Sequence, residues 1–134
     1  MDDPNLVEVE LDSPGLIKHK EELFADLWRW QEKRVYRTNR LKKWITTQQG
    51  VDSRRSGELI ALIHSELSEC LEYLRHDNPK SNHIDTSGAE EELADVLIRI
   101  MDLAYMRRYD IPNALSLKMN YNKTRPIRHG GKKF

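Results

Sequence analysis

Two pairs of acidic residues in the middle of the chain have the types and spacing to bind a metal ion. Glu66 and Glu69 form one pair, Glu92 and Asp95 form the other, and each pair has i, i+3 spacing in a segment with helical periodicity. That spacing places both carboxylates of a pair on one helical face. If the two helices pack side by side, four carboxylates converge, and their repulsion requires a cation. Oxygen ligands alone favour a hard divalent ion such as Mg²⁺.

The periodicity gives the acidic residues different environments. A helical projection places Glu66 within the apolar face of its helix, where an unpartnered ionised carboxylate is very costly. Glu66 therefore requires an arginine, a lysine or a metal ion. On the other helix, Glu92, Asp95, Arg99 and Asp102 follow a 3-4-3 spacing and form one polar stripe. A structural ion pair between Asp95 and Arg99 is the alternative interpretation of that stripe.

The elements that must position these residues are helices. The apolar positions recur with a period near that of an α-helix, and no segment alternates with the period of a β-strand. Ser87 and Glu90 have capping-box spacing, which marks the start of a helix. Low helix propensity predicts a weakness at residues 36–39. The predicted helices are residues 16–48, 57–75, 87–109 and 113–123.

These helices predict an all-α fold, a small bundle of four to five helices. The helix at 87–109 is apolar over more than half its circumference, so we expect it to be central and packed on two sides. Residues 1–15 are expected to form an irregular arm, residues 16–125 a single helical domain, and residues 126–134 a basic tail. A chain of 134 residues has the length of one domain.

The formal net charge of zero conceals an uneven distribution. Acidic residues predominate between His64 and Asp102, whereas no acid occurs from Ser116 onward. An acidic centre and a basic end would suit a metal–polyphosphate ligand, because each would bind its complement. The alternative is a solvated acidic helix with a disordered basic tail. Because the acidic centre would repel a phosphate backbone, no nucleic-acid partner is expected.

Several other classes of site are disfavoured. Cys70 is the only cysteine, so neither an intrachain disulfide nor a thiolate metal cluster can form, and its apolar face predicts burial. No histidine follows a glutamate at the spacing of a di-iron bundle, and zinc-hydrolase and Walker A motifs are absent. Neither a signal segment nor a membrane-spanning stretch is recognisable, so the expected location is cytoplasmic, without a membrane partner.

The two acidic motifs resemble a known family signature. Glu66-x-x-Glu69 followed by Glu92-x-x-Asp95 is similar to the ExxE…ExxD signature of the MazG-like, all-α nucleoside triphosphate pyrophosphohydrolases. The likeness covers roughly residues 57–130. It implies hydrolysis of an NTP or dNTP substrate to the monophosphate and pyrophosphate, with Mg²⁺ required and Mn²⁺ as an alternative ion. It also implies a homodimer or a homotetramer.

The same resemblance implies roles for the acidic residues. Glu66, Glu69, Glu92 and Asp95 would be metal ligands, unless one glutamate serves instead as the general base for water. Glu66 and Glu69, together with Lys118, are the candidate catalytic residues. These roles are compatible with phosphoryl chemistry, in which cations stabilise the charge that develops on the leaving group.

A second motif lies near the end of the chain. Lys118, Asn122 and Arg125-Pro126 resemble the family's Lys-x-x-x-Asn-x-x-Arg-Pro motif. The resemblance implies that Lys118, Asn122 and Arg125 contact the phosphates or the sugar. Arginine suits a bidentate grip on phosphate, and lysine acts as a mobile point charge. A solvated end of the chain is the alternative for these cations.

Base recognition has the weakest sequence signal. Trp44 is the preferred candidate for stacking on the base, and an ordinary core or interface aromatic is the alternative. The alternative function is a non-catalytic helical nucleotide-binding or interaction module of the same fold. The sequence identifies neither the preferred base nor the sugar.

Overall fold

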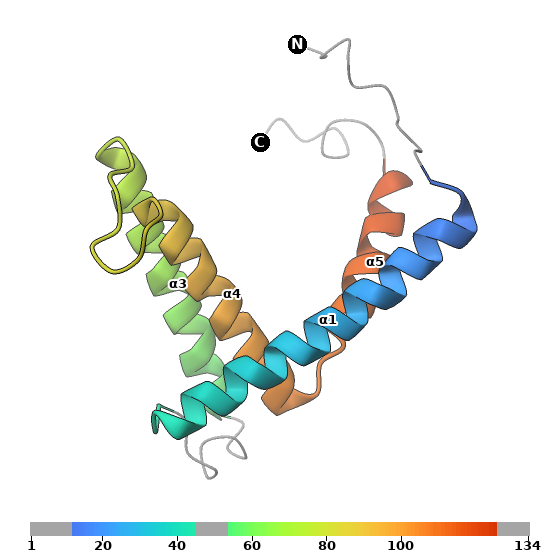
Figure 1. Cartoon of the computed structure of the whole chain (residues 1–134), viewed down its shortest axis with the longest axis horizontal. Helices are drawn as coiled ribbons and strands as arrows, with labels where there is room; N and C mark the ends of the chain where they lie inside the picture. Colours follow the sequence, from blue (N-terminus) through green and yellow to red (C-terminus); the bar gives the residue numbers. More distant parts are fainter. Residues whose placement is uncertain (1–11, 45–53, 126–134) are drawn as a thin grey trace. The chain divides into compact units, whose positions relative to one another are not determined.

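The computed structural model describes residues 12–44 and 54–125, and the predicted all-α fold is confirmed (Figure 1). Within those two stretches there are four helices and no β-strand. The helices are α1 (Pro14–Leu41), α3 (Arg54–Arg75), α4 (Gly88–Arg107) and α5 (Ile111–Lys123).

The chain divides into two compact units, which are described separately. Unit 1 comprises residues 1–28 and 111–134, and unit 2 comprises residues 29–110. In unit 1, Ser116 Oγ on α5 donates a hydrogen bond to Glu21 Oε1 on α1 at 2.6 Å. Unit 2 contains the end of α1, all of α3 and α4, and every acidic residue of the two predicted pairs.

The predicted capping box starts α4. Ser87 Oγ accepts a hydrogen bond from the Glu90 backbone N–H at 3.3 Å, and Glu90 Oε2 accepts from the Ser87 backbone N–H at 2.9 Å. These bonds satisfy two backbone donors that a helix start otherwise leaves unpaired. At the other end, Arg108 adopts a left-handed conformation with φ of 57° and terminates the helix. The sequence therefore predicted α4 to within two residues at its C-terminal end.

Helices α3 and α4 lie side by side and carry most of the buried residues of unit 2 (Figure 1). Leu59 and Cys70 on α3 and Ala89, Leu103 and Ala104 on α4 are buried. The burial of Cys70 is as predicted. This packing positions the two acidic pairs, because each pair belongs to one of the two helices.

The predicted weakness at residues 36–39 is wrong, because α1 continues through them to Leu41. Packing outweighs low propensity here. Asn39 is buried and its Nδ2 donates a hydrogen bond to Asp102 Oδ2 on α4. The Tyr36 ring lies 4.6 Å from the Tyr105 ring, measured between centroids. The predicted helix is too long at its end, because residues 42–44 form a turn, and its last predicted residues, 45–48, lie outside the described residues.

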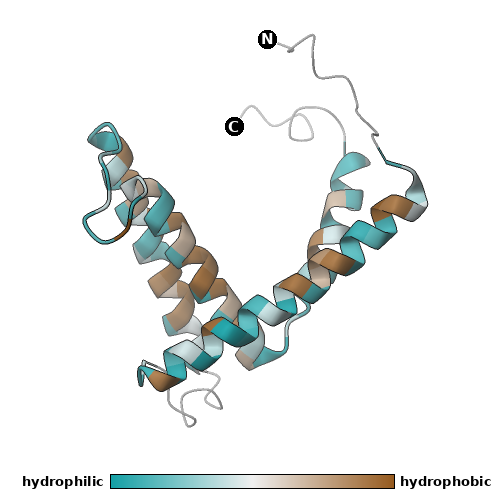
Figure 2. Cartoon of the chain, in the orientation of Figure 1, coloured by the Kyte–Doolittle hydropathy of each residue, from teal (hydrophilic) through white to brown (hydrophobic). Residues whose placement is uncertain are grey.

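The expectation that α4 is the central helix and is packed on two sides is met at its C-terminal end only. Its C-terminal end contacts both α3 and the end of α1, as Asp102 and Tyr105 show. Nearer its start, however, Leu93 and Leu97 are about half exposed. Colouring by hydropathy shows apolar segments along both α3 and α4 (Figure 2).

Among the described helices, none combines the length and the apolar character that crossing a membrane requires.

Candidate metal centre and adjoining cavity

Three carboxylates from two helices meet in unit 2. Glu66 and Glu69 on α3 and Glu92 on α4 each place one oxygen within 4.8 Å of the other two. Glu66 and Glu92 are each only 7% exposed, whereas Glu69 faces solvent. The i, i+3 spacing brings the first two together, and the packing of α3 on α4 adds the third. The structure thus gathers three of the four predicted ligands.

The proximity of these groups perturbs their ionisation. Burial raises the pKa of Glu92 to about 7, and the charge on Glu69 and a hydrogen bond with Glu66 act in the same direction. Like charges in a poorly hydrated site disfavour complete ionisation. Without a cation, a proton therefore relieves the repulsion in part. A bound cation would have the same effect and would lower the pKa of Glu92.

Arg99 is the partner that the buried Glu66 requires. Its Nε donates a hydrogen bond to Glu66 Oε1 at 2.6 Å, and its Nη2 forms an ion pair with the same oxygen. The sequence left arginine, lysine and metal open as partners for Glu66, and the structure supplies an arginine. Its ion pair crosses from α4 to α3, so Arg99 connects the two helices.

Asp95, the fourth predicted ligand, lies outside the group of three. It lines a neighbouring cavity and is partly exposed. Burial and the nearby charge on Glu66 raise its pKa, while Arg99 lowers it. Asp95 is therefore close enough to interact electrostatically with the cluster, and its role as a ligand stays a prediction.

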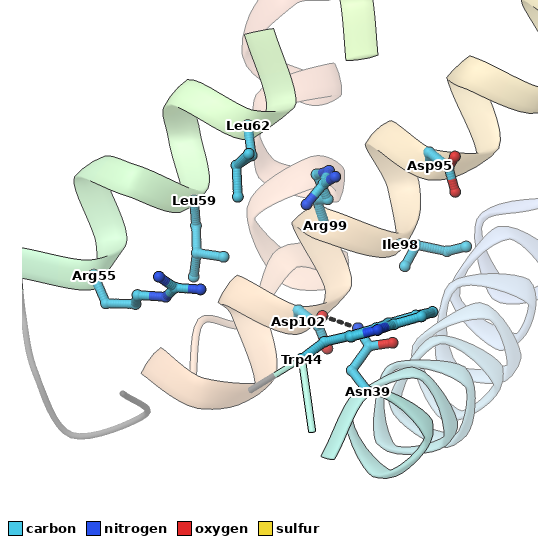
Figure 3. Close-up of a pocket in the computed structure, with 9 residues that line it drawn as sticks. All are labelled: Asn39, Trp44, Arg55, Leu59, Leu62, Asp95, Ile98, Arg99 and Asp102. Carbon is cyan, nitrogen blue, oxygen red and sulfur yellow. Dashed lines mark hydrogen bonds between the residues drawn. The ribbon is translucent and has the colours of Figure 1, made fainter. Parts of the chain in front are cut away.

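The cavity lies beside the carboxylates, between α3, α4 and the end of α1, and has a volume of about 400 Å³ (Figure 3). Leu59, Leu62 and Ile98 supply apolar lining, and Asp95 and Arg99 line it as well. Because Arg99 also binds Glu66, the cavity and the three carboxylates share a wall. Trp44, the aromatic residue predicted for base stacking, lines the cavity and is 66% exposed.

Asp102 is the most deeply buried acid of the cavity, with 4% exposure. Its Oδ2 accepts a hydrogen bond from Asn39 Nδ2, whereas its buried Oδ1 has no hydrogen-bond partner among the described residues. Burial raises the pKa of Asp102 to about 6, although the bond from Asn39 and the charge on Arg99 oppose the rise. Arg55 Nε, also buried in the wall of the cavity, likewise lacks a partner in the described part of the chain.

Sequence reasoning missed most of this cavity. The spacing of the polar stripe identified Asp102 but assigned it no role of its own. Asn39 lies in the segment that was expected to weaken the helix, and Arg55 precedes the predicted start of its helix. The sequence signal at Asn39 was only its low helix propensity, which does not indicate that its side chain is buried against another helix.

Three predicted phosphate-contacting residues belong to unit 1. Lys118 and Asn122 are exposed on α5, and Arg125 is exposed just after it. The Lys118 ammonium lies 4.8 Å from the centre of the Tyr121 ring, a cation–π contact. Their roles stay predictions, and the basic tail at residues 126–134 lies outside the described residues.

A scan against models of protein families finds no match to this chain. Searches of curated proteins and of solved structures also find none. The relationship to MazG-like pyrophosphohydrolases therefore rests on the motifs alone and stays a prediction.

Proposed function

We propose that this protein is a Mg²⁺-dependent nucleotide pyrophosphohydrolase, which converts an NTP or dNTP to the monophosphate and pyrophosphate. The observation that carries the proposal is the meeting of Glu66, Glu69 and Glu92 within 4.8 Å on two packed helices. The motif resemblance supplies the reaction, and the carboxylates supply the chemistry that it needs.

The donor set fits a magnesium ion. Ligand oxygens around one Mg²⁺ lie at most about 4.2 Å apart, because each is roughly 2.1 Å from the ion. Oxygens that already lie within 4.8 Å of one another reach such positions by small side-chain rotations. The set contains oxygen donors only, as a hard cation prefers. The raised pKa of Glu92 is compatible with this fit, since burial is its main cause and the nearby acids add to it, and a cation would offset both effects.

The chain's own residues have separable tasks in this reaction. A bound Mg²⁺ would neutralise phosphate charge and acidify a bound water. We assign the general-base role to Glu69, because it is exposed at the edge of the cluster and would accept the proton when water attacks the α-phosphorus. Glu66 is held in position by Arg99. As the bond to the bridging oxygen breaks, pyrophosphate leaves, and Lys118 and Arg125 are the cations that the motif assigns to the phosphates.

A nucleotide panel tests the proposal. The protein is incubated with the common NTPs and dNTPs, with and without Mg²⁺, and pyrophosphate and inorganic phosphate are measured separately. We expect pyrophosphate release that requires Mg²⁺, and loss of at least two orders of magnitude in Glu69→Gln. Glu72→Gln is the matched control, because Glu72 lies on the same helix and pairs with Arg75 and His76 instead.

The alternative, a nucleotide-binding module without turnover, has one observation in its favour. Arg99 already compensates the charge on Glu66, so the cluster is partly neutralised without a metal ion. The nucleotide panel distinguishes the two functions. Saturable nucleotide binding without pyrophosphate release from any member of the panel would favour the module.

We also propose that the protein acts as a homodimer or homotetramer. Leu71 on α3 and Leu97 on α4 are 48% and 49% exposed, and Leu67, Leu74 and Leu93 are exposed to similar extents. Among the described residues, no large side chain is fully buried. Exposed leucines on two adjacent helices form an apolar surface that a second copy can cover, as in a four-helix bundle.

A further inference from the structure

We propose that the cavity between α3, α4 and the end of α1 binds a nucleobase, and that Asp102 selects bases with an exocyclic amino group. The inference rests on the proposed function, because it assigns the base of that substrate to a site and the phosphates to the neighbouring carboxylates. It adds a substrate class that neither the motifs nor the metal cluster specifies.

The dimensions and lining of the cavity suit a base. Its volume of about 400 Å³ is within the range of small-molecule sites, roughly 300–1,000 Å³. Leu59, Leu62 and Ile98 give it apolar walls. Such sites bind a planar ring through apolar contact and fix its orientation with a few polar groups.

Trp44 supplies an aromatic surface at this cavity. Its side chain is 66% exposed, although a tryptophan normally buries most of its apolar area. Figure 3 shows the indole among the residues that line the cavity, with Asp102 and Asn39 nearby. Stacking on a base would cover the indole and contributes about 1–3 kcal/mol per base in other proteins.

Two buried polar atoms in the wall of the cavity, one acceptor and one donor, have no hydrogen-bond partner among the described residues. Buried polar atoms in proteins are nearly always hydrogen-bonded, so Asp102 Oδ1, which has no partner among the described residues, calls for an N–H or O–H donor. Asn39 already occupies Oδ2, which leaves a single oxygen for a ligand. Arg55 Nε is the complementary donor, and it has no partner within residues 12–44 and 54–125.

The amino-bearing bases match this pair of requirements. Cytosine, adenine and guanine each present an amino N–H beside a ring nitrogen or a carbonyl acceptor. Thymine and uracil also have one ring N–H, at N3, but a carbonyl oxygen flanks it on each side, and the carboxylate repels both oxygens. A site built around a hydrogen bond rejects an analogue that leaves its polar group unpaired. Asp102 would therefore disfavour thymine and uracil.

The position of the cavity agrees with a nucleotide bound across both sites. Asp95 and Arg99 line the cavity, and Arg99 is hydrogen-bonded to Glu66 of the carboxylate cluster. A nucleotide whose base occupies the cavity could therefore extend its phosphates toward the carboxylates, which would hold the metal ion.

The test uses deoxynucleoside monophosphates, which lack the bond to be cleaved. Binding of dCMP, dAMP, dGMP and dTMP to the full chain is measured by calorimetry and by tryptophan fluorescence. We expect at least one amino-bearing nucleotide to bind about tenfold more tightly than dTMP, and Asp102→Asn to abolish that preference. Asp85→Asn is the matched control, because Asp85 is exposed and pairs with Lys80 away from the cavity.

Trp44→Ala provides a second variant that does not depend on a buried residue. Since Trp44 is exposed, its loss should leave the fold intact and weaken binding of every nucleotide about tenfold. Equal affinity for all four monophosphates, or unchanged binding in both variants, would overturn the proposal even if triphosphates are hydrolysed. A base preference without pyrophosphate release would instead retain the cavity and reject the hydrolase.

Discussion

Arg99 on α4 donates a hydrogen bond to Glu66 on α3 at 2.6 Å and thereby joins the carboxylate cluster to the cavity. The guanidinium is the cation that compensates the buried carboxylate in the metal-free protein. A magnesium ion at the cluster would add positive charge beside Arg99. The arginine and such an ion would therefore compete, in part, to neutralise the same acid.

This relationship predicts the effect of Arg99→Gln. Breaking a buried ion pair costs about 3–5 kcal/mol, and since the Arg99 side chain is 32% exposed we expect about 2 kcal/mol. Excess Mg²⁺ should restore more stability to this variant than to the wild type. Urea unfolding with and without Mg²⁺ measures both effects.

Arg75→Gln is the control for that measurement, because Arg75 pairs with Glu72 on the exposed side of α3. Its loss should change the free energy of unfolding by less than about 1 kcal/mol. If Arg99→Gln is no more destabilising than this control, the Arg99–Glu66 pair does not hold α4 to α3.

Glu92→Gln separates stability from metal binding. The substitution keeps the shape of the side chain and removes one of three adjacent negative charges. We expect the metal-free protein at pH 8 to gain stability, because a buried charge and its repulsion are lost. The stabilisation by Mg²⁺ that we expect for the wild type in thermal melts should be absent from this variant. A variant that is still stabilised by Mg²⁺ to the wild-type extent would place the ion elsewhere.

The sequence predicted what depends on local pattern. Periodicity placed Glu66 on a buried face, and the capping box located the start of α4. The sequence could not identify the hydrogen-bond partners of the buried acids, since Arg99 is 33 positions from Glu66 and Asn39 is 63 positions from Asp102. Such pairs depend on how helices pack, and the same packing extends α1 through residues that favour a break. The cavity arises from these contacts and has no local signature.

The raised pKa of Asp102 predicts a pH-dependent stability. Burial raises this pKa from 3.8 to about 6, so the folded protein holds a proton that the unfolded chain releases between these values. The folded state is consequently favoured at low pH, and this contribution is lost as the pH rises through 6. Relative to Asp102→Asn, the wild type should lose about 2–3 kcal/mol between pH 4 and pH 7.

Chemical denaturation across that pH range, done without Mg²⁺, provides the measurement. The difference between wild type and Asp102→Asn is informative because other carboxylates contribute equally to both proteins. A difference that does not change with pH would mean that Asp102 titrates normally and is better hydrated than its burial indicates.

The exposed leucines predict a change in assembly. Leu71→Glu places a charge in the apolar surface proposed to contact a second copy, and the monomer should tolerate it because Leu71 is 48% exposed. We expect light scattering after gel filtration to show a monomer in place of the oligomer. Leu41→Glu, at an 83% exposed position at the end of α1, should leave the mass unchanged. If both variants remain oligomeric, this surface is not part of the interface.

Gly88 and Gly57 form a matched pair for testing the packing of α3 on α4. A Cβ atom at Gly88 would overlap the Tyr73 ring, whereas a Cβ atom at Gly57 would meet nothing within 4 Å. Gly88→Ala must displace the ring and should destabilise the protein by about 1–3 kcal/mol. Gly57→Ala should stabilise it by up to about 1 kcal/mol, because alanine favours the helix interior.

The two substitutions are expected to change the free energy of unfolding in opposite directions. Helix propensity alone would favour alanine at both positions, so a loss of stability at Gly88 only would be due to the contact with Tyr73. Thermal unfolding of the two variants gives both values. A Gly88→Ala protein as stable as the wild type would show that Tyr73 can move away without cost. The close approach at the start of α4, which sets the position of Glu92 relative to Glu66 and Glu69, would then be loose, and the carboxylate cluster would depend on other contacts between α3 and α4.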